Sequence, residues 1–392
     1  MHRPLFFALF CLLLTFAVAR TKLPHAIPYA SAELLALQEM VPLDDSYPTL
    51  SDFWDGRAEF VIDIEDTGLP RGESETLIMQ NGEWWSYVHA SDRSAGVVDR
   101  CGDPVEFPGC TVIYRSEDGR RFTLTEPVCQ FECRQCPCNP DKDHTPQQQY
   151  PRVYTDGRTA WLVYEYLSRV MLRRSADGVT WSLPERVGTT GFQSDATPCM
   201  MWELIGPHPF THVEDFRCLA GGPPGIFVEG GRVYVFVGMG QSPGHLGCFV
   251  GSVREAAVQF RPCTHNPLLS GADSYGPLEA QGEAGDPYWD FRMVSSAEVI
   301  AVGEQYYLLY EGIRGPGPND PGDTQFGVGL ARTVDGAIDG RWEKYPHNPL
   351  LQPLPGNIGL GHADLVVHNG ETILFTSLDG ETRSRLKLVW KG

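Results

Sequence analysis

Short apolar strands separated by turn residues recur along this chain. The stretch FRMVSSAEVIAVGEQYYLLYEG (291–312) shows the plan: an apolar run, a turn, and then an aromatic-aliphatic run. Two such runs on either side of Gly, Asn or Asp are typical of a β-hairpin. The same plan recurs in four other stretches, at 75–90, 152–166, 225–240 and 364–380.

The five hairpins are evenly spaced. Aligned on their turns, they place equivalent positions at Gly82, Gly157, Gly231, Glu304 and Gly370, at intervals of 75, 74, 73 and 66 residues. Unrelated hairpins of a β-sandwich would not predict this regularity, whereas a fixed period indicates a repeat architecture. Five units of four strands, radially arranged, make a five-bladed β-propeller. The sequence therefore predicts an all-β fold, a five-bladed propeller with four-stranded blades.

Two further signatures repeat after the hairpins. Ser or Thr stands two residues before Asp-Gly at 114–122, 173–181 and 331–342, and the Asp side chain of such a turn can bond nearby backbone amides. We expect these turns to join the third and fourth strands of a blade. THNPLL (264–269) and PHNPLL (346–351) mark matching exits from blades three and four.

The last repeat is short, so the ring needs another strand. We expect the strand in AEFVIDIEDT (58–67) to complete the fifth blade, since closure removes exposed sheet edges. The propeller is then expected over residues 58–392. It follows an N-terminal extension at 20–57, in which SAELLALQEM (31–40) is the one helix that the pattern predicts.

Residues 1–19 are typical of a signal peptide. MHR gives a positive start, PLFFALFCLLLTF an apolar core, and AVA a small-x-small cleavage site. The apolar run is too short for a comfortable membrane span. We therefore expect a secreted or periplasmic protein. Ten cysteines remain once Cys11 is removed, and disulfides are expected, although CQFECRQCPC (129–138) leaves zinc as an alternative.

The charge balance excludes some partners. The chain has 31 basic and 50 acidic residues, a net charge of −19, and loss of Arg3 with the signal peptide makes it −20. This charge repels nucleic acid and anionic membrane surfaces. It is compatible with a neutral ligand such as a sugar. We expect a monomer that binds carbohydrate, and neither nucleic acid nor a membrane.

The repeat plan resembles that of the five-bladed propeller glycosidases, which include glycoside hydrolase families 43, 32 and 68. The resemblance rests on the hairpins, the turns, the NPLL exits and GLGHADLVV (359–367), which is similar to the fifth-blade G-x-G-H motif of family 43. It implies a sugar pocket on the propeller axis, lined by the heads of the innermost strands. His362 matches the motif directly, so the resemblance implies a central water or Ca²⁺ near His362. No other cofactor and no metal site among the candidate residues is expected.

The catalytic carboxylates of family 43 are absent at their simplest positions. Ser74 stands at the first-blade head, Gln149 at the second, and GGPP (221–224) replaces the third-blade E-G-P motif. Glycoside hydrolysis normally needs two carboxylates, so displaced acids are the candidates. Glu75 would supply one after a shift of one residue in register. Three acids are therefore the candidate catalytic residues: Glu75, Asp215 and Glu298.

Other residues are candidates for substrate binding. Arg152 and Arg292 could bind sugar hydroxyls or pair with acids, and Trp289 in DPYWDF (286–291) could stack on a pyranose ring. His362 and Asp364 lie at the fifth-blade head, although Asp364 could equally be a hydrogen-bonded core residue.

Three classes of function follow from these residues. The leading hypothesis is a secreted glycoside hydrolase-like protein that uses carboxylate acid–base chemistry. The alternative is a catalytically inactive carbohydrate-binding propeller. A sialidase-like propeller would use Arg152, Arg292 and Arg383, but five repeats rather than six count against it.

Overall fold

A computed structural model of the chain gives its architecture. The structure describes residues 36–37, 46–70, 74–79, 81–89, 111–126, 149–155, 158–166, 169–187, 223–239, 243–254, 257–273, 288–314, 325–351, 362–378 and 382–392. The expected signal peptide, the cysteine-rich stretch at 129–138 and Asp215 lie outside these residues.

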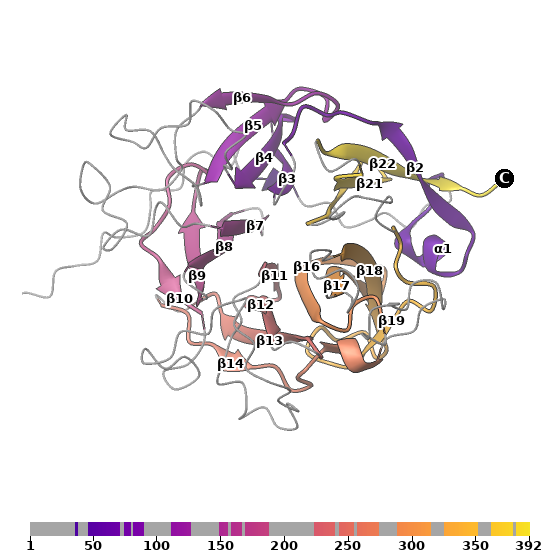
Figure 1. Cartoon of the computed structure of the whole chain (residues 1–392). Helices are drawn as coiled ribbons and strands as arrows, with labels where there is room; N and C mark the ends of the chain where they lie inside the picture. The colour runs from indigo at the N-terminus through magenta and orange to yellow at the C-terminus, as the bar shows by residue number, and fades with distance from the viewer. Residues whose placement is uncertain are drawn as a thin grey trace, which may run out of the picture.

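Five antiparallel sheets stand around one axis, as the sequence predicts (Figure 1). Blade 1 contains β3 (Ser74–Met79), β4 (Trp84–His89), β5 (Thr111–Ser116) and β6 (Thr123–Glu126), from the axis outwards. Blade 2 contains β7 (Gln149–Thr155), β8 (Ala160–Tyr166), β9 (Arg169–Ser175) and β10 (Glu185–Arg186). Blade 3 contains β11 (Gly225–Glu229), β12 (Arg232–Met239), β13 (His245–Ser252) and β14 (Arg261–Pro262), and β15 (Leu269–Ser270) also pairs with β13. Blade 4 contains β16 (Met293–Val302), β17 (Gln305–Arg314), β18 (Gln325–Thr333) and β19 (Trp342–Lys344).

Blade 5 joins the two ends of the propeller, which confirms the predicted closure. It contains β20 (Asp364–His368), β21 (Glu371–Thr376), β22 (Ser384–Trp390) and, outermost, β2 (Ala58–Ile64). Strand β2 pairs antiparallel with β22, with Phe60 opposite Leu388.

The helix predicted over 31–40 is wrong at the two residues of that stretch that the structure describes. Ala36–Leu37 form β1, which pairs antiparallel with Met79 and Ile78 at the inner edge of β3. The Ala- and Leu-rich sequence has a high helix propensity, but the open edge of β3 offers backbone partners that override it.

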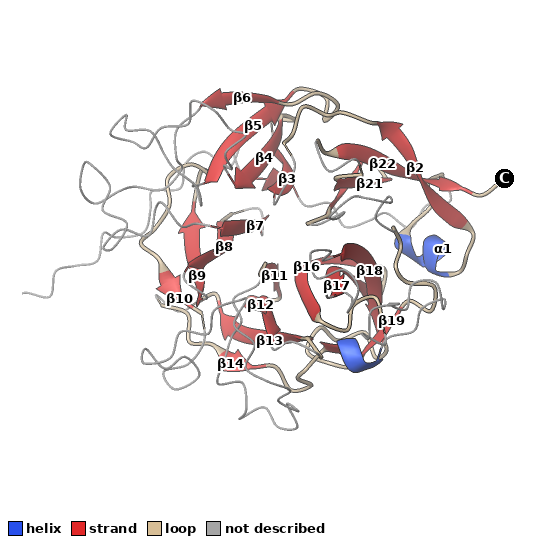
Figure 2. Cartoon of the chain, viewed as in Figure 1, coloured by secondary structure: helices blue, strands red, loops and turns tan. Residues whose placement is uncertain are grey.

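Helices contribute little to the fold (Figure 2). Among the described residues they are α1 (Leu50–Trp54), which packs beside blades 4 and 5, and the 3₁₀ turn Gly271–Asp273. In the ranges that the structure describes, no helix is long and apolar enough to cross a membrane.

The hydrophobic core lies between neighbouring blades. Five clusters of buried side chains fill the five junctions. Along β11, Ile226 and Val228 pack towards blade 2, while Phe227 packs towards blade 4. Successive side chains of a strand point to opposite faces, so a strand buried on both faces reads as a continuous apolar run. This explains the unbroken apolar hairpins in the sequence.

The repeated turns carry the predicted hydrogen bonds. In blade 2, Ser175 Oγ accepts from Gly178 N at 2.8 Å, and Asp177 Oδ1 accepts from Val179 N at 2.9 Å. These turns follow the third strands β5, β9 and β18, as expected. The NPLL motifs also have matching roles. Asn348 bonds both the N–H and the C=O of Leu330, and Asn266 does the same to Cys248.

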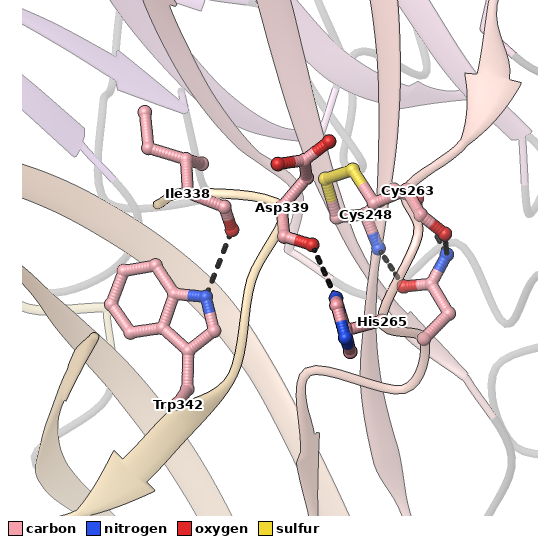
Figure 3. Close-up of a disulfide and its surroundings, with 7 residues drawn as sticks. Cys248, Cys263, His265, Ile338, Asp339 and Trp342 are labelled. Atoms are coloured by element: carbon pink, nitrogen blue, oxygen red, sulfur yellow. Dashed lines mark hydrogen bonds between the residues drawn. A yellow bond between two sulfur atoms is a disulfide. The ribbon is translucent and has the colours of Figure 1, made fainter. Parts of the chain in front are cut away.

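One disulfide lies within the described part of the chain. Cys248 of β13 is bonded to Cys263, just after β14 (Figure 3). Close by, His265 Nδ1 lies 3.0 Å from the carbonyl oxygen of Asp339, which brings the outer strands of blades 3 and 4 together.

Candidate functional site

Three blades have a residue in the left-handed backbone region near the head of the inner strand. These residues are Tyr150 (φ 57°), Ser296 (φ 54°) and His362 (φ 59°). A non-glycine residue with positive φ is uncommon and carries a free-energy cost. In β7 and β16 the strand register also shifts at this point. The strained heads of three blades therefore meet at one end of the axis.

Two residues further along each strand, an ionisable side chain reaches the axis. These side chains are Arg152, Glu298 and Asp364. In blade 2 this residue is Arg152, whereas counting back six residues from Gly157, as from Glu304 to Glu298, gives Pro151. The pairing is continuous from Arg152–Val163 to Thr155–Ala160, so position 158, rather than Gly157, is the counterpart of Glu304 in blade 4.

Arg152 is the centre of this arrangement. Its side chain is buried, and its guanidinium donates to Ser74 O (3.0 Å) and Glu75 Oε2 (3.2 Å) of blade 1. It also donates to Ser296 Oγ (2.7 Å) of blade 4 and Ala363 O (3.1 Å) next to blade 5. One side chain of blade 2 thus binds three other blades.

Two carboxylates bind the backbone of the next blade. Glu298 Oε2 accepts from Leu365 N at 2.6 Å, and Asp364 Oδ2 accepts from Thr76 N at 2.8 Å. Thr76 therefore takes the place in blade 1 that Leu365 takes in blade 5. This makes Glu75, rather than Ser74 or Thr76, the counterpart of Asp364 and supports the shift in register considered for the first blade.

Asp364 is a structural residue in this arrangement. Its side chain is fully buried and forms an ion pair with the fully buried Arg383, which also donates to Phe375 O at 2.9 Å. Because both oxygens of Asp364 are engaged inside the protein, it does not present a group to a substrate. Burial of Arg383 in this pair also explains why it is not part of an arginine cluster open to a ligand.

Glu75 and Glu298 are electrostatically coupled around Arg152. Burial raises the pKa of Glu75 to about 8, against the opposing charge of Arg152 and with a further rise from Asp364. Burial also raises the pKa of Glu298 well above its usual value, and the charge of Glu75 raises it further. Buried carboxyls of like charge do not ionise together easily, so ionisation of Glu75 opposes that of Glu298.

Both carboxyls line a cavity of about 120 Å³ on the axis. Its walls follow the inner strands from Glu75, Arg152 and Glu298 at one end to Glu229 at the other. The partly exposed surface of Glu298 is part of this wall. Sites for small-molecule ligands typically have about 300 to 1,000 Å³, so the part of the cavity that the described residues enclose has room for water molecules, and a sugar ring would have to bind at its mouth.

His362 lies at the same end of the axis and is buried, with 9% of its surface exposed. Its Nδ1 is 3.2 Å from Glu311 Oε2, and its ring packs on Tyr150 with centroids 5.3 Å apart. Tyr150 in turn lies 6.1 Å from the buried His89 of blade 1. The described residues contain no group of three His, Cys, Asp or Glu placed to hold a metal ion. A Ca²⁺ ion near His362 stays a prediction, since backbone carbonyls and water also bind this ion.

Trp289 and Arg292, which the sequence suggested as substrate-binding residues, do not line the axial cavity. Trp289 is 5% exposed and packs in the core between Tyr310, Gly312 and Gly327, so it has no open face for a sugar. Arg292 lies just before β16 and is partly buried. Asp290, the other acid near this strand, forms a buried ion pair with Lys344 Nζ at 2.7 Å.

Sequence reasoning missed Glu311, Tyr150 and His89. A signal for Glu311 exists in the repeat. The second strands of blades 2 and 4 both carry Tyr-Glu near their ends, and Glu165 and Glu311 pair with Gln149 and Ser295 at the strand heads.

No protein-family model matches the chain, and no curated protein matches it. The five-bladed fold is shared with solved structures, of which three are the following. An endo-arabinase from Bacteroides thetaiotaomicron VPI-5482 is 10% identical, with a TM-score of 0.51 over 85% of this chain and 98% of that one. A glycosyl hydrolase from Bacteroides ovatus is 14% identical, with a TM-score of 0.51 over 83% and 85% of the two chains. A thermostable family-43 glycoside hydrolase is 14% identical, with a TM-score of 0.50 over 82% and 92%. The resemblance seen in the sequence is confirmed for the fold.

Proposed function

We propose that this chain is a glycoside hydrolase-like protein that cleaves glycosidic bonds of oligo- or polysaccharides, with Glu75 and Glu298 as its acid–base pair. The observation that carries the proposal is the coupled pair of buried carboxyls on the wall of one axial cavity. Hydrolysis of a glycosidic bond needs one protonated and one ionised carboxyl at the same pH. The fold supports this choice only as an analogy, since one fold hosts many activities.

The charges on the axis favour a single shared proton. Glu75, Glu298 and Asp364 carry three negative charges when ionised, and Arg152 and Arg383 carry two positive ones. One proton on the Glu75–Glu298 pair makes this buried group neutral. Neutrality matters here because an uncompensated charge is costly to bury. The pair is thus suited to hold one proton near neutral pH.

The direct partners of the two carboxyls support different roles. Burial raises the pKa of Glu75 to about 8, but Arg152 donates to Glu75 and opposes this rise, so Glu75 is the better candidate to ionise first and to act as base. Burial and the nearby charge of Glu75 favour the protonated form of Glu298, which suits the role of acid. In this scheme Glu298 protonates the oxygen of the leaving sugar. Glu75 accepts a proton from the attacking water.

The remaining properties are proposed on separate grounds. We propose that the protein is exported to the cell exterior or the periplasm and acts there as a monomer. The Cys248–Cys263 disulfide supports export, because stable disulfides belong mainly to oxidising compartments. A neutral carbohydrate is the proposed partner, with arabinan as the first substrate to test, since one structure of this fold is an endo-arabinase.

The test is glycan hydrolysis by matched variants. Wild-type protein is assayed on arabinan, xylan and a panel of 4-nitrophenyl glycosides, and E298Q is expected to lose at least about a hundredfold in kcat. The control is E185Q. Glu185 also accepts a backbone N–H from the next blade, Val258 N at 2.9 Å, but from the outer strand β10. E185Q should keep its activity, and full activity of a folded E298Q would refute the proposal.

A carbohydrate-binding propeller without catalysis is the second candidate. It is favoured by one observation: the axial charges already have architectural partners, such as Leu365 N for Glu298 and Ser74 O for Arg152. A glycan-array screen discriminates between the two. Binding without any hydrolysis, unchanged in E298Q, is the result that the binding function predicts.

A further inference from the structure

Glu311 and His362 form a carboxylate–imidazole pair where blades 4 and 5 meet. Glu311 lies on β17 and is 2% exposed, and His362 precedes the first residue of the inner strand β20 by two positions. A single oxygen of Glu311 makes both contacts. Its Oε2 accepts from the backbone N–H of His362 at 2.9 Å and lies 3.2 Å from the ring Nδ1 of the same residue.

This double contact fixes a residue in a costly conformation. His362 has a φ of 59°, which a non-glycine residue adopts only when its surroundings hold it there. Glu311 stabilises this conformation by accepting a hydrogen bond from the backbone N–H of His362. Tyr150, which is also in the left-handed region, stabilises it as well, because its ring packs on the imidazole. The imidazole is therefore contacted by Glu311 at Nδ1 and by the ring of Tyr150.

We infer that Glu311 is a positioning residue that keeps His362 protonated on Nδ1, so that Nε2 is the acceptor for a hydroxyl group of the carbohydrate. The inference rests on the proposed function for the kind of ligand, and extends it to Glu311, which is not one of the acid–base pair. A neutral imidazole has one donor and one acceptor nitrogen. The partner of one nitrogen decides which is which, and a carboxylate at Nδ1 selects the Nδ1–H form.

The ring contact is the part of the pair that matters for this role. Ring Nδ1 lies 3.2 Å from Oε2 without forming a full hydrogen bond to it, whereas the backbone N–H forms one to the same oxygen. Hydrogen bonds of catalytic groups are often poorly aligned before the substrate binds and tighten afterwards. If Glu311 served only to join blades 4 and 5, the backbone bond would be enough. The ring tautomer would then not depend on Glu311.

The tautomer is measured in the free protein, without any ligand. Long-range ¹H–¹⁵N NMR of histidine-labelled wild-type protein at about pH 7.5, above the usual pKa of histidine, is expected to show His362 as the Nδ1–H form, with its signals assigned from H362Q. E311A should lose this preference, and E311Q should keep it because its amide oxygen still accepts. An Nε2–H or doubly protonated His362 in the wild type, or an unchanged E311A, overturns the inference. If E311A does not fold, E311D withdraws the carboxylate instead.

The second readout is glycan affinity in a double-mutant cycle. Affinities for arabinohexaose and xylohexaose are measured by calorimetry for wild type, E311A, H362A and the double variant. Loss of one hydrogen bond predicts about a tenfold weaker affinity in E311A. If Glu311 acts through His362, the double variant is no weaker than H362A. Additive losses contradict the inference. If the wild type binds neither glycan, the carbohydrate function fails, while the NMR result still decides the role of Glu311.

Discussion

Arg152 of blade 2 donates a hydrogen bond of 3.2 Å to Glu75 of blade 1, and both side chains are almost completely buried. The same guanidinium bonds Ser296 of blade 4 and the backbone beside blade 5. The axis of this propeller is therefore held by a buried charge rather than by apolar packing alone.

Removal of Arg152 should destabilise the whole ring. R152M leaves Glu75 and the neighbouring acids without their main counter-charge, so a loss of about 3 to 5 kcal/mol in the free energy of unfolding is expected. Urea denaturation measures it. The control is R120A, which removes the exposed pair with Asp63 and should cost less than about 1 kcal/mol. A loss in R152M as small as that of the control would show that the axial charge is not needed.

Stability should fall as the pH rises from about 5 to 8. Glu75 has a pKa of about 8 in the folded protein against 4.5 for the free group, so the folded state binds the proton more tightly. The stabilisation from this proton is complete below the unfolded pKa and is lost as the pH rises through the folded one. Asp118 does not add to this fall in stability, because the backbone N–H of Arg120 lowers the pKa of its carboxyl, and a lowered pKa has the opposite effect on stability.

Thermal unfolding at a series of pH values measures this effect. The slope of the melting temperature between about pH 5 and 8 should be clearly smaller in E75Q than in the wild type. E185Q serves again as the control and should keep the wild-type slope. A melting temperature that rises over this range in the wild type would contradict the raised pKa.

Asp364 should behave as a structural residue rather than a ligand-binding one. D364N leaves the fully buried Arg383 without its counter-charge, and a loss of about 3 to 5 kcal/mol is expected. E298Q should cost much less, because its amide oxygen can still accept from Leu365 N. Urea denaturation of the two variants compares them directly. Equal losses would mean that the two carboxyls have the same role.

The asparagines of the two NPLL motifs should be equally important for stability. Asn348 bonds both backbone groups of Leu330, and N348A would leave the N–H of Leu330 without this acceptor, while its C=O keeps the bond from Tyr345 N. The expected loss is about 1 to 3 kcal/mol, which is the cost of one unsatisfied buried group. N266A makes the same change beside Cys248 in blade 3. Calorimetric unfolding of both variants tests the equivalence, which a loss in one variant alone would disprove.

The repeat was predictable because its signal is long-range and redundant. Five hairpins at similar spacing, with turns and NPLL exits in matching places, leave few alternatives to a ring. The role of β2 could be predicted because the fifth repeat is too short for four strands, so its blade needed one strand from elsewhere in the chain. Trp84 and Trp85 illustrate the limit of local reading: adjacent in β4, they pack into two different junctions, so both belong to the core.

Local geometry at the site was harder to predict. The pairing of β7 with β8 places Arg152, one residue after Pro151, at the position of Glu298 and Asp364, and the turn residue Gly157 alone does not indicate this. Trp289 reads as an exposed loop aromatic, but Gly312 and Gly327 leave the space that its indole fills. A Cβ atom at Gly312 would lie 2.2 Å from the Trp289 ring. Such a fit depends on strands far apart in sequence.

The pairing of β2 with β22 also constrains how this chain can fold. Residues 58–64 find their partner only when residues 384–390 are available, so the closing contacts have a very high contact order. As synthesis proceeds from the N-terminus, blades 1 to 4 can assemble while blade 5 still lacks its C-terminal strand. The ring therefore cannot close before the last blade is complete, and any cut that removes β22 leaves the edge of β2 open to intermolecular pairing.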